Sequence, residues 1–138
     1  MNLRMLCVIL SLLLGQAGCT SMSRNALNVR TFGAVGDGMI KDTAAFQKAL
    51  DACAAANGGE VVVPAGNYLI GSIELKSDTV LRLEKDAHLI GSPDLDDYPV
   101  IKIRWEGHWI DGHRALIFAR NAGHFGIVGS GKYPPIPR

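Results

Sequence analysis

Side chains suited to recognising a charged sugar lie close together in one stretch, IKIRWEGHWIDGHR, at residues 101–114. Indole rings can lie against pyranose rings, and the forked guanidinium of arginine matches the carboxylate of a uronic acid. From Lys102 to Arg120 the chain carries four basic residues against two acidic ones, which weakly favours an anionic ligand. We therefore identify a set of candidate substrate-binding residues for an anionic sugar: Arg104, Trp105, Glu106 and His108.

A structural interpretation of the same stretch is also open. It would be a long loop whose tryptophans pack on the rest of the fold and whose charges pair with one another, because nothing in the spacing defines a pocket. The adjacent carboxylates Asp96 and Asp97 stand between two prolines in SPDLDDYP, a pattern typical of a solvated turn. We predict no catalytic role for them.

Cysteine and histidine offer no clearer site. Cys53 lies at helical spacing from two apolar residues, which favours a small buried side chain over a nucleophile. Three histidines are spaced by 5 and 11 positions, which matches no compact set of metal ligands: His108, His113 and His124. We expect no metal and no cofactor.

The elements that would position these residues begin with a turn and a helix. NVRTF (28–32) has the alternation and β-branched residues of a short strand, and the three glycines of GAVGDG (33–38) permit a tight turn. A helix is predicted over 42–56, with Asp42 accepting from its first N–H groups and an Asn-Gly-Gly sequence ending it. Asp37 is predicted to be a turn residue. One helix face is apolar, through Phe46, Ala49, Leu50 and Cys53.

An internal repeat indicates what the helix covers. LIGS occurs at 69–72 and again at 89–92, and the same offset of 20 aligns EVVVP (60–64) with VLRLE (80–84). Such a period predicts a solenoid in which each rung carries short strands that pair in parallel with those one period away. A related IVGS follows at 127–130 after an insertion that covers residues 92–115.

These segments together resemble glycoside hydrolase family 28, the polygalacturonases, within the pectin-lyase-like superfamily. The resemblance lies in FGAVGDG…DT…FQKAL, in the two rungs that follow, and in RWEG and ALIFARNAGHFGIVGSG. It implies an all-β solenoid, namely the N-terminal rungs of a right-handed parallel β-helix, capped at its N-terminal end by the helix at 42–56. The corresponding part of the chain is residues 28–131.

The resemblance also implies a chemistry, which is inverting hydrolysis of galacturonan by an acid and a base on opposite sides of the glycosidic bond. The family takes its catalytic residues from later rungs, in Asn-x-Asp, Asp-Asp, Gly-His-Gly and Arg-x-Lys motifs. Asn-x-Asp, Gly-His-Gly and Arg-x-Lys do not occur in this sequence, and Asp96–Asp97 does not match the family's pair in position or context. We therefore expect this chain alone to be inactive and assign it no catalytic residue. The alternative function is a non-catalytic β-helix that binds polysaccharide or acts as a tailspike-like adhesin.

The two ends of the chain predict export and an unusual tail. Residues 1–18 have a charged start and a short apolar run, as in a secretory signal peptide, and QAGC resembles a bacterial lipobox ending at Cys19. We expect lipidation of Cys19 and a place in the bacterial periplasm or at the outer membrane, with simple secretion as the alternative. KYPPIPR (132–138) is expected to be an aberrant or truncated tail, because its prolines cannot continue a central strand.

The composition sets limits on other partners. Fourteen Lys and Arg residues stand against 13 Asp and Glu residues, so no overall positive field favours nucleic acid. A membrane partner is expected only through the lipid.

Overall fold

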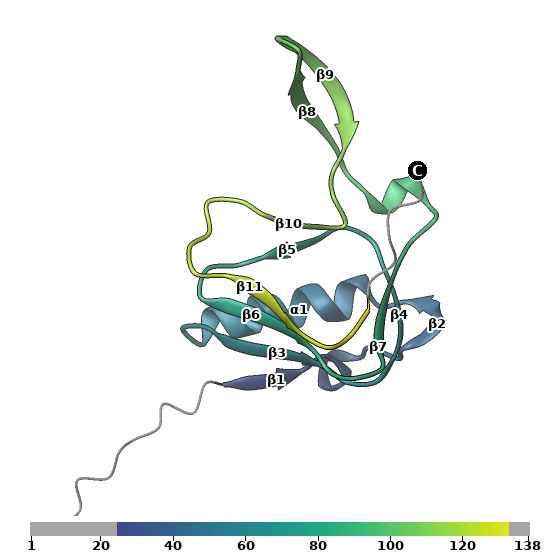
Figure 1. Cartoon of the computed structure of the whole chain (residues 1–138), viewed down its shortest axis with the longest axis vertical. Helices are drawn as coiled ribbons and strands as arrows, with labels where there is room; N and C mark the ends of the chain where they lie inside the picture. Colours follow the sequence, from purple (N-terminus) through teal and green to yellow (C-terminus); the bar gives the residue numbers. More distant parts are fainter. Residues whose placement is uncertain (1–24, 133–138) are drawn as a thin grey trace, which may run out of the picture.

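The computed structural model describes residues 25–132, which form mainly short parallel strands (Figure 1). The predicted signal peptide, Cys19 and residues 133–138 of the predicted tail lie outside the described residues. Within the described residues, no helix combines the length and apolar character needed to cross a membrane.

The strands form three parallel sheets that make the sides of a β-helix. The first sheet has the order β1 (Ala26–Asn28), β3 (Gly59–Val63), β6 (Thr79–Leu83) and β11 (Gly126–Gly129). The second contains β2 (Asp37–Lys41), β4 (Gly66–Ile70) and β7 (Ala87–Gly91). The third pairs β5 (Ile73–Leu75) with β10 (Ile117–Ala119). The chain visits the three sheets in turn and then returns to the first, so the predicted parallel β-helix is confirmed.

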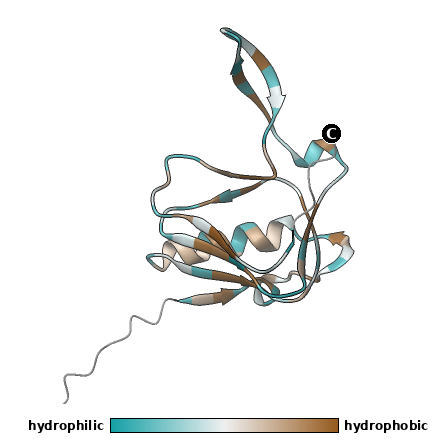
Figure 2. Ribbon diagram, viewed as in Figure 1, coloured by the Kyte–Doolittle hydropathy of each residue, from teal (hydrophilic) through white to brown (hydrophobic). Residues whose placement is uncertain are grey.

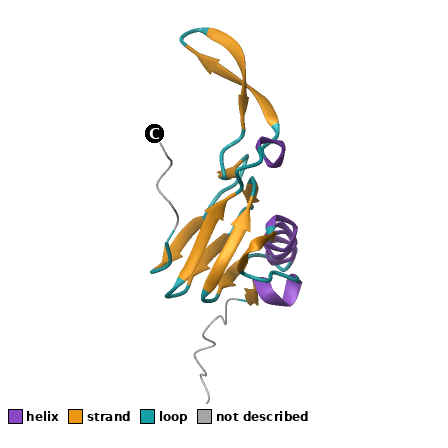
Figure 3. Cartoon of the chain, turned by 90° about the vertical axis from the view of Figure 1, so that its right-hand side faces the viewer, coloured by secondary structure: helices purple, strands orange, loops and turns teal. Residues whose placement is uncertain are grey.

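Helix α1 (Thr43–Ala55) lies at the β1 end of the stack of strands (Figure 3). Its predicted apolar face is buried, and the ring of Phe46 meets that of Tyr68 edge to face, with centroids 5.4 Å apart. The helix ends where Asn57 and Gly58 adopt positive φ angles and the Gly58 N–H donates to the Cys53 carbonyl. The expected N-terminal capping helix is therefore confirmed.

The segment NVRTF is not the predicted strand. It forms a short 3-10 helix, η1 (Val29–Phe32), directly after β1. Asn28 Oδ1 accepts from the Arg30 N–H at 2.9 Å, and the Thr31 hydroxyl donates to the Asn28 carbonyl at 2.7 Å. These local side-chain bonds stabilise a helical turn in spite of the β-branched residues.

The repeat of 20 holds for one sheet but not for the next. In the first sheet Glu60 is opposite Val80, an offset of 20, whereas in the second sheet Leu69 is opposite Ile90, an offset of 21. The extra residue lies in the turn before β7, where Asp86 has a φ of 64°. The two LIGS copies are therefore not equivalent, because Leu89 faces the core and Leu69 does not.

The third copy, IVGS, occupies a different side of the β-helix from the first two. Ile127 in β11 is opposite Leu81 in β6, so this segment continues the first sheet, whereas both LIGS copies belong to the second. The predicted insertion before it is confirmed, since β10 returns to pair with β5 only after residue 116. Along the strands of the body, hydrophobic and hydrophilic positions alternate, as expected for side chains that point in and out (Figure 2).

Candidate functional site

The stretch chosen from the sequence forms an antiparallel hairpin rather than a loop. Strands β8 (Val100–Trp105) and β9 (His108–His113) pair with each other and project from the body of the β-helix (Figures 1 and 3). Glu106 and Gly107 make the connection with φ angles of 44° and 88°, as in the two-residue turns whose twist matches a hairpin. Alternation of apolar and polar residues in the first strand, followed by Glu-Gly, is the signal in the sequence that could have indicated a hairpin.

The pairing of β8 with β9 divides the four candidate residues between two faces. Arg104 is opposite Trp109, and Trp105 is opposite His108. Opposite residues of an antiparallel pair share a face, and neighbours along a strand point to different faces. Arg104 and Trp109 therefore lie on one face, Trp105 and His108 lie on the other, and Glu106 lies in the turn. The four candidates share the hairpin tip but do not form one cluster.

The two tryptophans do not pack on the solenoid. The exposed fraction is 63% for Trp105 and 68% for Trp109, so the interpretation of buried tryptophans is wrong. Internal charge pairing does occur once within the hairpin, where Lys102 Nζ lies 2.7 Å from Asp111 Oδ1. Arg104 pairs with no carboxylate among residues 25–132. An unpaired guanidinium and an exposed indole thus stand side by side on one face.

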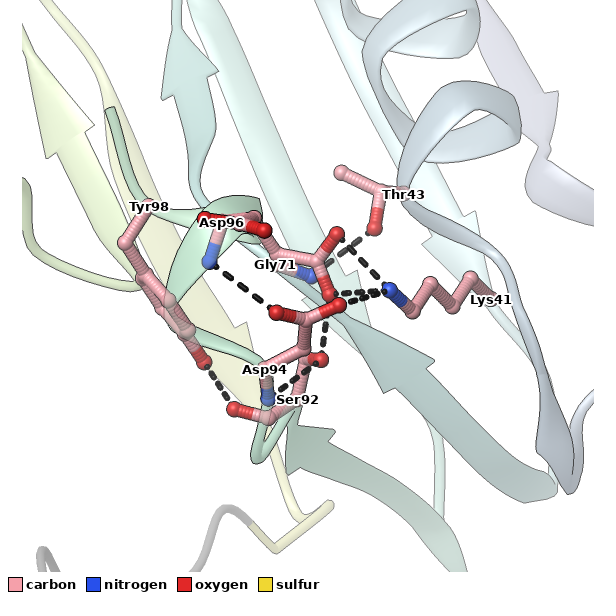
Figure 4. A network of polar contacts seen from close by, with 8 residues as sticks. Lys41, Thr43, Gly71, Ser92, Asp94, Asp96 and Tyr98 are labelled. Atoms are coloured by element: carbon pink, nitrogen blue, oxygen red, sulfur yellow. Dashed lines mark hydrogen bonds and ion pairs between the residues drawn. The ribbon is translucent and has the colours of Figure 1, made fainter.

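The base of the hairpin is held by an ion-pair network that the sequence did not reveal (Figure 4). A short 3-10 helix, η2 (Leu95–Asp97), precedes β8. Lys41 Nζ from β2 lies 3.0 Å from Asp94 Oδ2 and 2.8 Å from Asp97 Oδ2. Bonding to Lys41 holds the pKa of both carboxyl groups below the usual 3.8, and the same contacts raise the pKa of Lys41. The two carboxylates and the ammonium group therefore remain charged at neutral pH.

This network corrects the interpretation of Asp96 and Asp97 as a solvated turn. Asp96 is exposed as expected, but the side chain of Asp97 is only 20% exposed and also accepts a hydrogen bond from the Ser92 hydroxyl. No local signal could have found the network, because Lys41 is 53 residues from Asp94 and 56 from Asp97.

Asp37, Asp42 and Cys53 have structural roles. Asp37 accepts from the N–H groups of Met39 and Ile40, but it is the first residue of β2 and not the predicted turn residue; the bond from Ile40 chiefly lowers its pKa. Asp42 precedes α1 but makes no side-chain bond to the helix, so its predicted capping role is wrong. Its carboxylate instead bonds to the glycine-rich turn. Cys53 is fully buried, as predicted, and burial raises the pKa of its thiol.

The histidines make separate contacts. His113 Nδ1 lies 2.9 Å from the Tyr98 carbonyl oxygen at the hairpin base, and His124 Nδ1 lies 3.5 Å from Asp78 Oδ1. In the part of the chain that the structure describes, no group of three or more His, Cys, Asp or Glu side chains is arranged to hold a metal ion.

The end of the stack opposite α1 is apolar. Beyond β10 and β11 lies a hollow of about 410 Å³ whose lining includes Leu75, Ile117 and Ile127. Phe125, which also lines the hollow, is 45% exposed, and Val128 of β11 is 48% exposed. Strand β11 is an edge of the first sheet, so this end offers both an apolar floor and a strand edge to a further rung.

Similarity to known proteins agrees with this geometry. The profile of the family described as rhamnogalacturonase A/epimerase, pectate lyase-like, matches residues 26–127. The exo-poly-alpha-D-galacturonosidase of Dickeya chrysanthemi is 42% identical over 80 residues, and the mannuronan C5-epimerase AlgE2 of Azotobacter vinelandii is 48% identical over 65. These matches cover 58% and 47% of this chain, but only 13% and 6% of the two relatives.

Among solved structures, the family 28 exopolygalacturonase of Yersinia enterocolitica superposes with a TM-score of 0.72 at 36% identity. The superposition covers 80% of this chain and 20% of that one. Because the family profile matches most of the chain and the solved structure superposes on most of it, the protein belongs to the rhamnogalacturonase A/epimerase, pectate lyase-like family.

Proposed function

We propose that this chain is the N-terminal part of a polygalacturonase-like glycoside hydrolase and that its hairpin tip binds galacturonan. The observation that carries the proposal is the exposed cross-strand pair of Arg104 and Trp109. The relative from Dickeya chrysanthemi and the structure from Yersinia enterocolitica, both named for action on polygalacturonate, support the choice of polymer.

The pair suits a single uronate residue. Directly opposite residues have Cβ atoms about 4.5–5.5 Å apart, so one sugar residue can contact both side chains. The ring can lie on the Trp109 indole while the carboxylate accepts from the Arg104 guanidinium. Trp105 and His108 offer a second aromatic and hydrogen-bonding surface on the other face, and Glu106 can accept from sugar hydroxyls at the turn.

Hydrolysis is assigned to residues that this sequence does not contain. An inverting glycosidase needs two carboxyl groups about 6.5–9.5 Å apart across the scissile bond. The hairpin tip supplies one carboxylate, Glu106, on an exposed turn, and the family's Asn-x-Asp, Gly-His-Gly and Arg-x-Lys motifs are absent from the 138 residues. The chain by itself is therefore expected to bind galacturonan without cleaving it.

Affinity electrophoresis tests the binding. The purified chain should be retarded in a gel that contains polygalacturonate and not in one that contains neutral dextran. Trp109→Ala should weaken the retardation about tenfold in dissociation constant, the equivalent of roughly 1.4 kcal/mol. Lys76→Met, which removes a surface charge paired with Glu74 on the body, is the matched control and should behave as wild type. Equal mobility in both gels would refute the proposal.

The same samples separate the enzyme proposal from a purely adhesive role. The lack of catalytic motifs in this sequence favours a binding module for the chain as it stands. Incubation with galacturonan should release no reducing ends, and release of reducing ends that survives purification would overturn the expectation of inactivity.

A further inference from the structure

We propose that Lys41 is a positioning residue that fixes the direction in which the β8–β9 hairpin projects, and that it does so by clamping Asp94 and Asp97 at the hairpin base. The inference rests on the proposed function only where it concerns sugar binding. The clamp itself is a statement about the hairpin and can be tested without a ligand.

Lys41 stands on a well-anchored part of the fold. It is the last residue of β2 and is paired with Leu69 of β4. The next residue, Asp42, is 2% exposed, and its N–H donates to the Leu69 carbonyl at 2.8 Å. Thr43 then starts α1 and its hydroxyl oxygen accepts from the Gly71 N–H at 2.8 Å. The ammonium group is therefore attached to backbone that is fixed on both sides.

The two carboxylates are attached to the segment that leads into the hairpin. The Asp97 carbonyl accepts from the Ser72 N–H at 3.0 Å, and Asp97 packs so closely on Gly71 that a Cβ there would come within 2.6 Å of it. The Tyr98 hydroxyl donates to the Ser92 carbonyl at 3.0 Å. Without the cation of Lys41, Asp94 and Asp97 would face each other as two anions, and their repulsion would push this segment open.

The hairpin has little else to hold it in place. Strands β8 and β9 contact each other far more than any other element. On the second leg, the Arg114 N–H donates to the Pro99 carbonyl at 3.0 Å, and the Ser72 hydroxyl donates to the Ala115 carbonyl at 2.7 Å. These two hydrogen bonds and the Lys41 network lie at the base of the hairpin (Figure 4 shows the Lys41 side). A six-residue strand such as β8 is about 20 Å long, so a rotation of about 10° at the base moves the tip by about 3–4 Å.

An exposed ion pair contributes little to the free energy of unfolding. The clamp therefore affects the direction of the hairpin more than the stability of the fold. The side chain of Lys41 is 46% exposed, and such pairs stabilise weakly. Loss of Lys41 should therefore leave the melting temperature almost unchanged and alter hairpin motion. This difference separates a positioning role from a merely structural one.

The chain carries its own reporter of hairpin motion, because its two tryptophans, Trp105 and Trp109, both lie in the hairpin. Time-resolved tryptophan anisotropy should show a nanosecond loss of orientation that is at least twice as large in Lys41→Met as in wild type. Lys41→Arg keeps the cation and should restore the wild-type decay. Lys76→Met is the matched control on the body and should match wild type. Circular dichroism confirms that each variant is folded.

An unchanged decay in Lys41→Met would overturn the clamp. If that variant fails to fold, Asp94→Asn, which removes the charge of one of the two partners, should give a smaller loss of orientation than expected for Lys41→Met. No loss in Asp94→Asn would likewise overturn the clamp.

Titration with oligogalacturonate is a separate measurement, which tests sugar binding. A wild-type chain that does not bind refutes the proposed function and leaves the anisotropy result to decide on Lys41. A wild-type chain that binds, with Lys41→Met equally tight in spite of its looser hairpin, refutes the link between hairpin direction and binding.

Discussion

A single carboxylate organises the turn between η1 and β2. Asp42 is almost completely buried, and its two oxygens accept from the N–H groups of Val35 at 2.7 Å and Gly36 at 3.0 Å. Gly36 has a φ of 73°, and a Cβ at this position would lie 2.8 Å from the Tyr68 ring. The aspartate and the glycine together allow the chain to turn tightly against the first rung.

Replacement of Asp42 by alanine should therefore destabilise the fold by about 1–3 kcal/mol, because two N–H groups lose their partner in a partly buried place. Urea unfolding followed by circular dichroism measures the loss. Asp96→Ala, at an exposed aspartate, is the control and should change the free energy of unfolding by less than about 0.5 kcal/mol. Equal effects of the two substitutions would contradict the role assigned to Asp42.

The Lys41 network also gives the hairpin base a defined response to pH. Because the pKa of Asp94 and of Asp97 is lowered by Lys41, their contribution to holding the base is complete above the usual 3.8 and is lost as the pH falls through the folded-state values. The pKa of Lys41 is raised, so its contribution is complete below 10.5 and is lost only above that. Tryptophan anisotropy should stay constant from about pH 5 to pH 9 and fall in more acidic solution.

Two further side chains contact the hairpin base, namely His113 beside the Tyr98 carbonyl and Tyr98, whose hydroxyl donates to the Ser92 carbonyl. A change of anisotropy within the range from about pH 5 to pH 9 would contradict the role of the carboxylates.

At the scale of elements, the hairpin depends on its two-residue turn. Glu106 has a positive φ of 44°, which a residue with a Cβ tolerates poorly. Gly107 has a φ of 88°, and a Cβ added to it would meet no atom within 4 Å. The turn is thus limited by backbone conformation and not by space. A lone two-stranded hairpin is marginally stable, so small changes here should alter its population measurably.

We predict that Gly107→Val destabilises the hairpin by about 1–2 kcal/mol and that Glu106→Asn, which creates the favoured Asn-Gly turn, stabilises it. Hydrogen exchange of the amides in β8 and β9 measures both effects, with the amides of β3 and β6 as the internal reference. Faster exchange in Glu106→Asn than in wild type would show that the turn does not control the hairpin.

The elements that were predicted correctly carry local signals. Each strand from β3 to β7 has apolar residues at alternate positions, and α1 has its apolar face at helical spacing, so neighbouring residues were enough. The register of β7 could not be predicted. A single extra turn residue changes the pairing offset from 20 to 21, although the LIGS sequence itself recurs at an offset of 20. The exposure of Trp105 and Trp109 could not be predicted either, because the residues next to a tryptophan in the sequence do not show whether its side chain packs on the body of the fold.

Across the whole molecule, the two ends of the stack differ. Helix α1 covers the first rung with a buried face, whereas the β10 and β11 end presents an apolar hollow and a strand edge. The chain spans only 20% of the family 28 exopolygalacturonase that it matches in structure. The resemblance to family 28 implies catalytic motifs in later rungs, so under the proposed function hydrolysis and the sugar contact would lie in different parts of the β-helix.

We also propose that the chain is exported and tethered through Cys19. If so, expression in a bacterium that processes lipoproteins should place the chain in the membrane fraction with a mass increased by its acyl groups. Cys19→Ala should move it to the soluble exported fraction, while Cys53→Ala, at a buried cysteine of α1, is the control for loss of a thiol. A chain that remains in the soluble exported fraction with Cys19 intact would favour simple secretion.

Titration of tryptophan fluorescence with oligogalacturonate measures whether the Arg104–Trp109 face of the hairpin binds a uronate sugar. We predict a saturable change with the free acid and a much weaker one with the fully methyl-esterified oligomer. Arg104→Gln should lose at least tenfold in affinity, because the sugar carboxylate then loses its charged partner. Equal affinity for acid and ester, or an Arg104→Gln variant that binds like wild type, would contradict the proposed binding.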